Sequence, residues 1–152
     1  MKIYTSYFYM VRFFLPHQIP ISTAVWDPKW FHDFKDQNYV WKDKNGVWNG
    51  IRMEELNPKS CNAYGCPCNT RKLKNPLHCK FITTYKEGLS KINFKDLYEC
   101  LEKTGELLKF ENVEPEIMLL VHEAPDNPCS ERLAIQELFI RNGIDVCEWK
   151  PE

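Results

Sequence analysis

Residues 117–121, Ile-Met-Leu-Leu-Val, form a continuous apolar run in the C-terminal third of the chain. A run with no polar alternation is typical of a strand that is buried on both faces, as in parallel sheets. A helical segment follows and runs to about Asn142, with Gly143 at its end. Residues 144–149 then form a second short strand. Strand, helix and strand in this order predict a βαβ unit, whose two strands are parallel with a right-handed crossover.

The N-terminal half adds further strands. Residues 2–9 and 19–25 are rich in β-branched and aromatic side chains and are predicted to be strands. Asp27-Pro28 predicts a helix start, with Asp as the N-cap and Pro at the first helical position. The apolar residues of that helix would be Trp30, Phe31 and Phe34. Lys44-Asn45-Gly46, which lies between two Val-Trp pairs, predicts a hairpin turn.

Two helices are predicted between these halves. Apolar residues at 81, 85, 89 and 92 have the spacing of one buried helical stripe. Asn93 can cap a second helix, whose inner side would carry Phe94, Leu97, Tyr98, Leu101 and Leu108. The 152 residues suit one domain. The fold class is therefore α/β: a small, mostly parallel sheet flanked by helices, interrupted by an irregular cysteine-rich insert at 57–80.

Composition excludes some classes of protein. The net charge is −1 and no dense Lys/Arg run occurs, so the footprint of a general nucleic-acid binder is missing. No apolar run approaches the roughly 18 residues of a membrane span. The start of the chain lacks the apolar core of a signal peptide. We expect a cytoplasmic protein that does not enter a membrane. In that reducing compartment, the seven cysteines favour metal ligation, catalysis or burial over disulfides.

The insert carries four cysteines within a short segment of few apolar residues: Cys61, Cys66, Cys68 and Cys79. Four thiolates at this spacing can reach one tetrahedral zinc ion. A structural zinc contributes on the order of 10 kcal/mol to folding such a segment. The spacing also leaves open an iron–sulfur cluster, or scattered thiols that are buried, free or paired in a disulfide. Elemental analysis of the purified protein would count the metal.

Polar residues follow the best predicted strands at their carboxyl ends, where ligands bind in parallel α/β sheets. Thr5, Ser6 and Tyr7 end the first strand, and Trp26 and Asp27 follow the second. His122 and Glu123 follow the central strand and lead to Cys129, Ser130 and Arg132 at a helix start. These residues are the predicted ligand-binding and catalytic groups.

Cys129 is the candidate nucleophile, because a helix N-terminus and Arg132 both lower the pKa of a nearby thiol. The same backbone amides can hold a phosphate or a carboxylate. The structural alternative is that Cys129 packs while Ser130 caps the helix and Arg132 pairs with a neighbouring glutamate. His122 is either a general base or a hydrogen-bonded structural residue.

Both ends of the chain resemble the domain of unknown function 488 family of bacteria and their phages. The resemblance rests on Met-Lys-Ile-Tyr-Thr-Ser-Tyr-Phe at 1–8, Leu-Leu-Val-His-Glu at 119–123, Pro125, Cys129, Asn-Gly-Ile at 142–144 and Glu148-Trp149. It implies an α/β fold with a strand-end site and supplies no reaction. In the commoner form of the family, the cysteine is followed directly by His and Arg. Here Ser130 and Glu131 stand between Cys129 and Arg132, so a Cys–His pair would need His122.

Two functions follow from these observations. The first is a zinc-stabilised α/β protein that binds, and processes or sequesters, a small anionic, nucleotide-derived ligand at the carboxyl ends of the strands. The alternative is a nucleic-acid or protein-binding module, for example a phage-encoded inhibitor of a host protein, that acts through the insert and its basic residues Arg71, Lys72 and Lys74. No enzyme class is assigned, because a fold does not determine a reaction.

Overall fold

A six-stranded parallel sheet organises the chain in the computed structural model, which describes residues 1–33, 48–58, 79–127 and 130–152. The strand order is β3-β4-β2-β5-β1-β6, and every neighbouring pair is parallel. The strands are β1 (Lys2–Tyr7), β2 (Gln18–Ser22), β3 (Phe31–Asp33), β4 (Trp48–Arg52), β5 (Glu116–Val121) and β6 (Val146–Glu148). The predicted α/β class with a parallel sheet is confirmed.

β5 lies in the interior of the sheet, between β2 and β1. Ile117, Leu119 and Val121 point into the main hydrophobic core, and Met118 and Leu120 point into a second core on the opposite face. All five side chains have no solvent exposure. The continuous apolar run is therefore a consequence of burial on both faces, as the sequence predicted.

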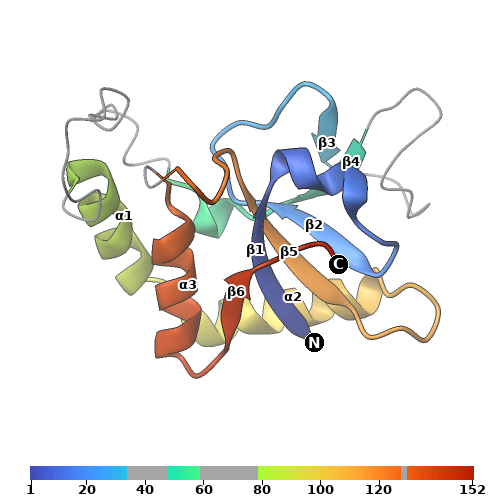
Figure 1. Cartoon of the computed structure of the whole chain (residues 1–152). Helices are drawn as coiled ribbons and strands as arrows, with labels where there is room; N and C mark the ends of the chain where they lie inside the picture. The colour runs from blue at the N-terminus through green and yellow to red at the C-terminus, as the bar shows by residue number, and fades with distance from the viewer. Residues whose placement is uncertain (34–47, 59–78, 128–129) are drawn as a thin grey trace.

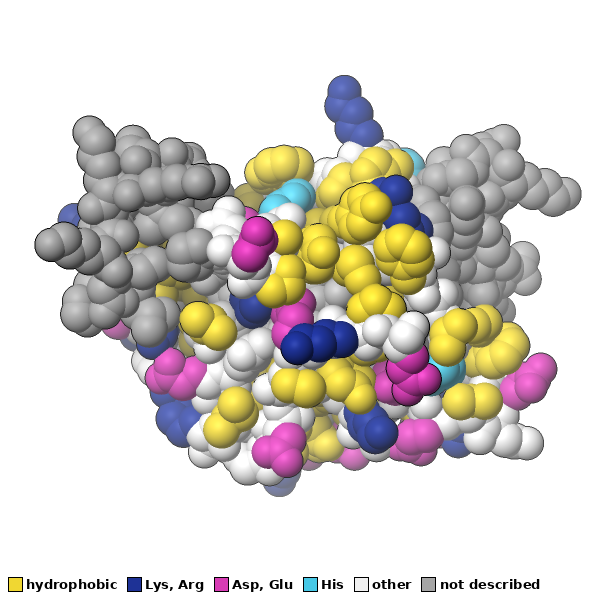
Figure 2. Space-filling view, viewed as in Figure 1, with side chains coloured by type: hydrophobic (Ala, Val, Ile, Leu, Met, Phe, Trp, Pro, Cys, Tyr) yellow, Lys and Arg dark blue, Asp and Glu magenta, His cyan; other side chains and the backbone are white. Residues whose placement is uncertain are grey.

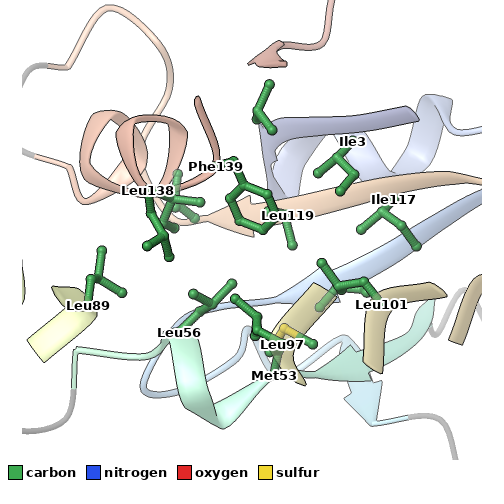
Figure 3. Packing of buried hydrophobic residues seen from close by; sticks show 14 of the residues in the cluster. Ile3, Met53, Leu56, Leu89, Leu97, Leu101, Ile117, Leu119, Leu138 and Phe139 are labelled. Atoms are coloured by element: carbon green, nitrogen blue, oxygen red, sulfur yellow. The ribbon is translucent and has the colours of Figure 1, made fainter. Parts of the chain in front are cut away.

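Three helices pack against the main core: α1 (Lys80–Ser90), α2 (Phe94–Leu107) and α3 (Arg132–Arg141). Figure 3 shows Leu101 of α2 beside Ile117 of β5, with Leu138 of α3 and Leu89 of α1 farther along the same cluster. Asn93 caps α2 as predicted, since its side chain accepts a hydrogen bond from the Asp96 amide at 3.2 Å. Within the described part of the chain, no helix is long and apolar enough to cross a membrane.

The opposite face of the sheet is covered by the 3₁₀ helix η1 (Phe8–Phe13) instead of an α-helix. Phe8 and Val11 of η1 pack with Ala24, Phe31, Met118 and Leu120 in the second core. The first strand therefore ends at Tyr7, two residues before its predicted end, because the chain turns back over the sheet. In Figure 1, η1 lies above the carboxyl end of β1. A second 3₁₀ helix, η2 (Glu54–Leu56), follows β4.

The predicted helix after Asp27-Pro28 is wrong. The chain enters the short strand β3 at Phe31 and pairs with β4. The Phe31 ring is buried against Phe8 at a centroid distance of 5.2 Å, and this long-range contact overrides the local helix signal. The Asp27 carboxylate accepts a hydrogen bond from Ser22 instead of capping a helix. Phe34, the predicted hairpin at 44–46 and most of the cysteine insert lie outside the described residues.

Candidate functional site at the carboxyl edge of the sheet

The parallel register brings the carboxyl ends of five strands to one edge. Ser22 of β2 is level with Leu120 of β5 and with Arg52 of β4. Leu120 is in turn level with Ser6 of β1, and Thr5 of β1 is level with Glu148 of β6. Polar groups that are far apart in the sequence therefore meet at this edge, as the strand-end argument predicts.

Asp27 organises the side of the edge that β2 and β4 form. Its carboxylate accepts a 2.5 Å hydrogen bond from the Ser22 hydroxyl and forms a 2.7 Å ion pair with Arg52. The other terminal nitrogen of Arg52 donates to the carbonyls of Ala24 and Val25, at 3.0 Å each. These contacts fix the loop after β2, and that loop carries Trp26.

Trp26 and His122 form the most exposed aromatic group at this edge, which we call the Trp26–His122 stack. Their ring centroids are 4.2 Å apart, and Trp26 is 66% exposed. The His122 Nε2 atom lies 2.7 Å from the Trp26 carbonyl oxygen. A carbonyl only accepts, so Nε2 carries the proton and donates it. Below, the His122 ring rests on buried Phe8 at 4.8 Å. The two rings are thus held in place at an interplanar angle of 37°, and most of the Trp26 surface is open to solvent.

Arg132 organises the other side of the edge, where β1, β6 and α3 meet. Its Nε donates to Glu148 Oε1 at 2.6 Å. Its terminal nitrogens donate to the carbonyls of Glu123 at 2.6 Å and Ala124 at 3.2 Å. The residue is only 4% exposed. Arg132 therefore ties the loop after β5 to β6 from a buried position, which does not suit direct contact with a ligand. The Ser130 hydroxyl accepts a hydrogen bond from the Arg132 backbone amide at 3.2 Å.

Thr5 and Ser6 point to opposite faces of β1. The Thr5 hydroxyl donates to Glu148 Oε1 at 2.9 Å and accepts from the Gln136 amide at 2.7 Å, and the residue is fully buried. The Ser6 hydroxyl is also buried and has no hydrogen-bond partner within the described residues. Tyr7 is partly exposed, and the Arg132 guanidinium lies 6.0 Å from its ring centroid. Of these three predicted residues, Tyr7 is the one that solvent reaches.

Glu131 is the most perturbed titratable group at the edge. Burial raises its pKa to about 7, and the nearby Glu123 carboxylate adds to the increase. Burial also raises the pKa of Glu148, against the opposing effect of Arg132. The Glu148 carboxylate is thus paired with the Arg132 guanidinium, while the pKa of the neighbouring Glu131 carboxyl group lies near neutral pH. A carboxyl group with such a pKa can donate or accept a proton at physiological pH.

This pKa shift predicts a pH-dependent stability. The pKa of Glu131 rises from an ordinary value of 4.5 to about 7 on folding, so between these values the folded protein holds a proton that the unfolded chain has lost. The free energy of unfolding should therefore fall as pH rises through this window. Between about pH 5 and pH 8, the free energy of unfolding of Glu131→Gln should decrease by about 2 kcal/mol less than that of the wild-type protein. Urea unfolding at several pH values measures it. Glu99→Gln, at an exposed site on α2, should leave the pH profile unchanged, and an equal effect of both substitutions would contradict the assignment.

The predicted metal ligands are only partly described. Cys61, Cys66 and Cys68 lie outside the described residues, as does Cys129. Cys79 is the N-cap residue of α1, is buried against Ile82 and forms no disulfide with either of the other cysteines that the structure describes, Cys100 and Cys147. The structural zinc and the reactive Cys129 thiolate therefore stay predictions.

Sequence reasoning did not select several residues that shape this edge: Arg52, Gln136, Glu148, and Tyr9 and Arg12 of η1. Glu148 and Arg52 each end a strand, so the strand-end rule applied to every strand would have found them. The role of Gln136 depends on which face of α3 meets β1, and η1 has no regular periodicity to reveal it.

Taken together, fold and site define an α/β protein with a parallel sheet, an exposed aromatic stack and a buried carboxyl–guanidinium network at the carboxyl edge. A comparison of the chain with protein-family models, curated proteins and solved structures finds no match. The resemblance to the domain of unknown function 488 family therefore stays a prediction.

Proposed function

We propose that this protein binds a nucleotide-derived ligand at the carboxyl edge of its sheet, with a flat base stacked on Trp26. The observation that carries the proposal is the exposed Trp26 ring, which is held at 4.2 Å on His122 beside the central strands. The Trp26 ring is 66% exposed, and its position is fixed by the His122 ring and by the hydrogen bond to its backbone carbonyl. Stacking on an aromatic ring is a general way to hold a nucleobase.

The surroundings of the stack supply polar partners of both kinds. Arg52 and Asp27 lie in the same loop network, and Arg12 and Lys29 are exposed on the neighbouring segments. In Figure 2, hydrophobic side chains gather over the upper middle of the face around a histidine, with Lys and Arg side chains beside them. Exposed cations next to a stacking ring suit the phosphate of a nucleotide.

Arg132 and the buried carboxyl groups have a supporting role in this proposal. Arg132 positions the loop after β5, and that loop carries His122 and Glu123. Glu131 is almost as buried as Arg132, so it supports the edge and is not placed to touch the ligand. The alternative of binding through the cysteine insert rests on residues outside the described part of the chain, so no structural observation favours it.

Trp26→Ala should weaken nucleotide binding. Removal of one stacking ring costs about 1–3 kcal/mol per base, which is roughly a 5- to 150-fold increase in Kd. Isothermal titration with a panel of mononucleotides measures the change. Because Trp26 is exposed, the free energy of unfolding should change little.

Leu107→Ala is the matched control, since Leu107 is 71% exposed and is the last residue of α2, from which the chain leads back to the opposite end of β5. It should bind nucleotides like the wild-type protein. If the wild-type protein binds none of the mononucleotides, or if Trp26→Ala binds them unchanged, the proposed function is wrong.

A further inference from the structure

Exposed aromatic rings continue from the edge onto η1. Tyr9 is 53% exposed and Phe13 is 50% exposed. The Tyr9 ring is stacked with Tyr7 at a centroid distance of 6.4 Å, and Phe13 lies 6.0 Å from Tyr9. We call Tyr7, Tyr9 and Phe13 the η1 aromatic row. Single exposed apolar side chains are ordinary, but a row of touching rings at the surface is a feature of binding sites.

A cation is fixed on this row. The Arg12 guanidinium lies 4.0 Å above the centroid of the Tyr9 ring, and its Nε donates to the Tyr9 carbonyl at 2.9 Å. Its terminal nitrogens are thereby held in a defined place beside the rings. An arginine held flat on a tyrosine presents both a planar surface and a positive charge.

Two exposed cations lie on the segments that form this surface. The charged side chains of segments 7–15 and 23–30 are Arg12, Asp27 and Lys29, and the loop that carries His122 adds Glu123 and Asp126. Asp27 is neutralised by its 2.7 Å ion pair with Arg52 and is only 11% exposed. Arg12 and Lys29 are exposed. Arg12, which lies over the Tyr9 ring, is the cation placed to meet a phosphate-bearing partner.

The η1 aromatic row and the Trp26–His122 stack are connected through Phe8. Phe8 lies between Tyr7 and Tyr9 in the sequence, and its buried ring contacts His122 at 4.8 Å. Both sets of rings are therefore linked to the second core through Phe8. η1, which carries Tyr9 and Phe13, lies at the carboxyl end of β1 (Figure 1). The surface offers more than one place for a flat ring to stack.

We infer that the nucleotide-derived ligand is a single-stranded nucleic acid whose successive bases use the Trp26–His122 stack and the η1 aromatic row. This inference rests on the proposed function and extends it from one nucleotide to several. Bases in a single strand are free to stack on protein rings, whereas bases in a duplex are already stacked on each other. Arg12 and Lys29 then meet the phosphates between the bases.

Segments 7–15 and 23–30 contribute two exposed cations, Arg12 and Lys29. The affinity for a single strand should therefore depend mainly on stacking. For single strands, the slope of log K against log salt is about −0.7 for each phosphate neutralised. The expected slope is therefore about −1.4, and Arg12→Gln should reduce its magnitude by about 0.7. This weak salt dependence agrees with a chain whose net charge is −1.

The test compares fluorescence-anisotropy Kd values of a mononucleotide, a dinucleotide, a longer mixed-sequence single strand and the matching duplex. The wild-type protein should bind the longer single strand most tightly. Phe13→Ala should weaken its binding roughly 5- to 150-fold and leave mononucleotide binding unchanged. Trp26→Ala should weaken both, and Leu107→Ala neither.

The outcomes separate the two proposals. Mononucleotide binding that does not improve with strand length, or that improves equally for duplex, overturns the inference and leaves the proposed function standing. The inference also fails if Phe13→Ala binds the longer strand as tightly as wild type while circular dichroism shows both folded. Absence of binding to every nucleic acid and nucleotide overturns both proposals.

Discussion

Arg132→Ala should lower the free energy of unfolding at neutral pH by about 3–5 kcal/mol, because it leaves a buried carboxylate without its partner. Glu148 keeps only 15% of its side-chain surface exposed and would retain the Thr5 hydroxyl as its donor. The carbonyls of Glu123 and Ala124 would lose their donors as well. Urea unfolding measures the loss.

Two further variants show whether the ion pair causes this loss. Arg141→Ala removes an exposed arginine from the last turn of the same helix and should cost less than about 1 kcal/mol. In a Glu148→Gln background, Arg132→Ala should cost less by roughly 1–3 kcal/mol, since no unpaired charge remains. A loss no larger than that of Arg141→Ala would show that the Arg132 contacts contribute little.

Gly50→Ala should lower the free energy of unfolding by roughly 3 kcal/mol, as overpacking in a filled site does. A Cβ atom on Gly50 would collide with the Phe31 ring and lie 2.8 Å from the Pro20 carbonyl oxygen. The carbonyl is part of β2 and cannot move away without disturbing the sheet. The Phe31 ring would have to leave the second core, where it contacts Phe8.

Gly88→Ala makes the same chemical change but should raise the free energy of unfolding. Gly88 lies in α1, and a Cβ atom there meets nothing within 4 Å. Alanine is the better helix former, so this variant should gain up to about 1 kcal/mol. Thermal and urea unfolding of the two variants side by side measure the difference. Equal effects would contradict the close packing of the Phe31 ring on Gly50.

The parts of the fold that local pattern determines were predictable. The apolar run at 117–121 identified a strand buried on both faces, and Asn93 identified the start of α2. Gly143, with a φ of 84°, ends α3 where the sequence placed the stop. In each case the residues that decide the structure are neighbours in the sequence, so their pattern carries the information.

The prediction failed where distant contacts decide. Asp27-Pro28 has the local signals of a helix start, but the Phe31 ring instead packs on Phe8 in the second core. The convergence of Thr5, Asp27 and His122 at one edge followed from the parallel sheet alone. The burial of Arg132 did not, because two of its acceptors are backbone carbonyls of a loop whose path no side-chain pattern encodes.

The strand order has a consequence for how the chain reaches this structure. β1 and β2 are neighbours in sequence but not in the sheet, since β5 lies between them and pairs with both. Neither early strand can complete its ladder until the chain beyond α2 has been synthesised. The contacts between β1 and β5 close a very long loop, and such non-local pairing slows folding. During synthesis, the pairing of β1 and of one edge of β2 with β5 is therefore delayed until the C-terminal third of the chain has been made.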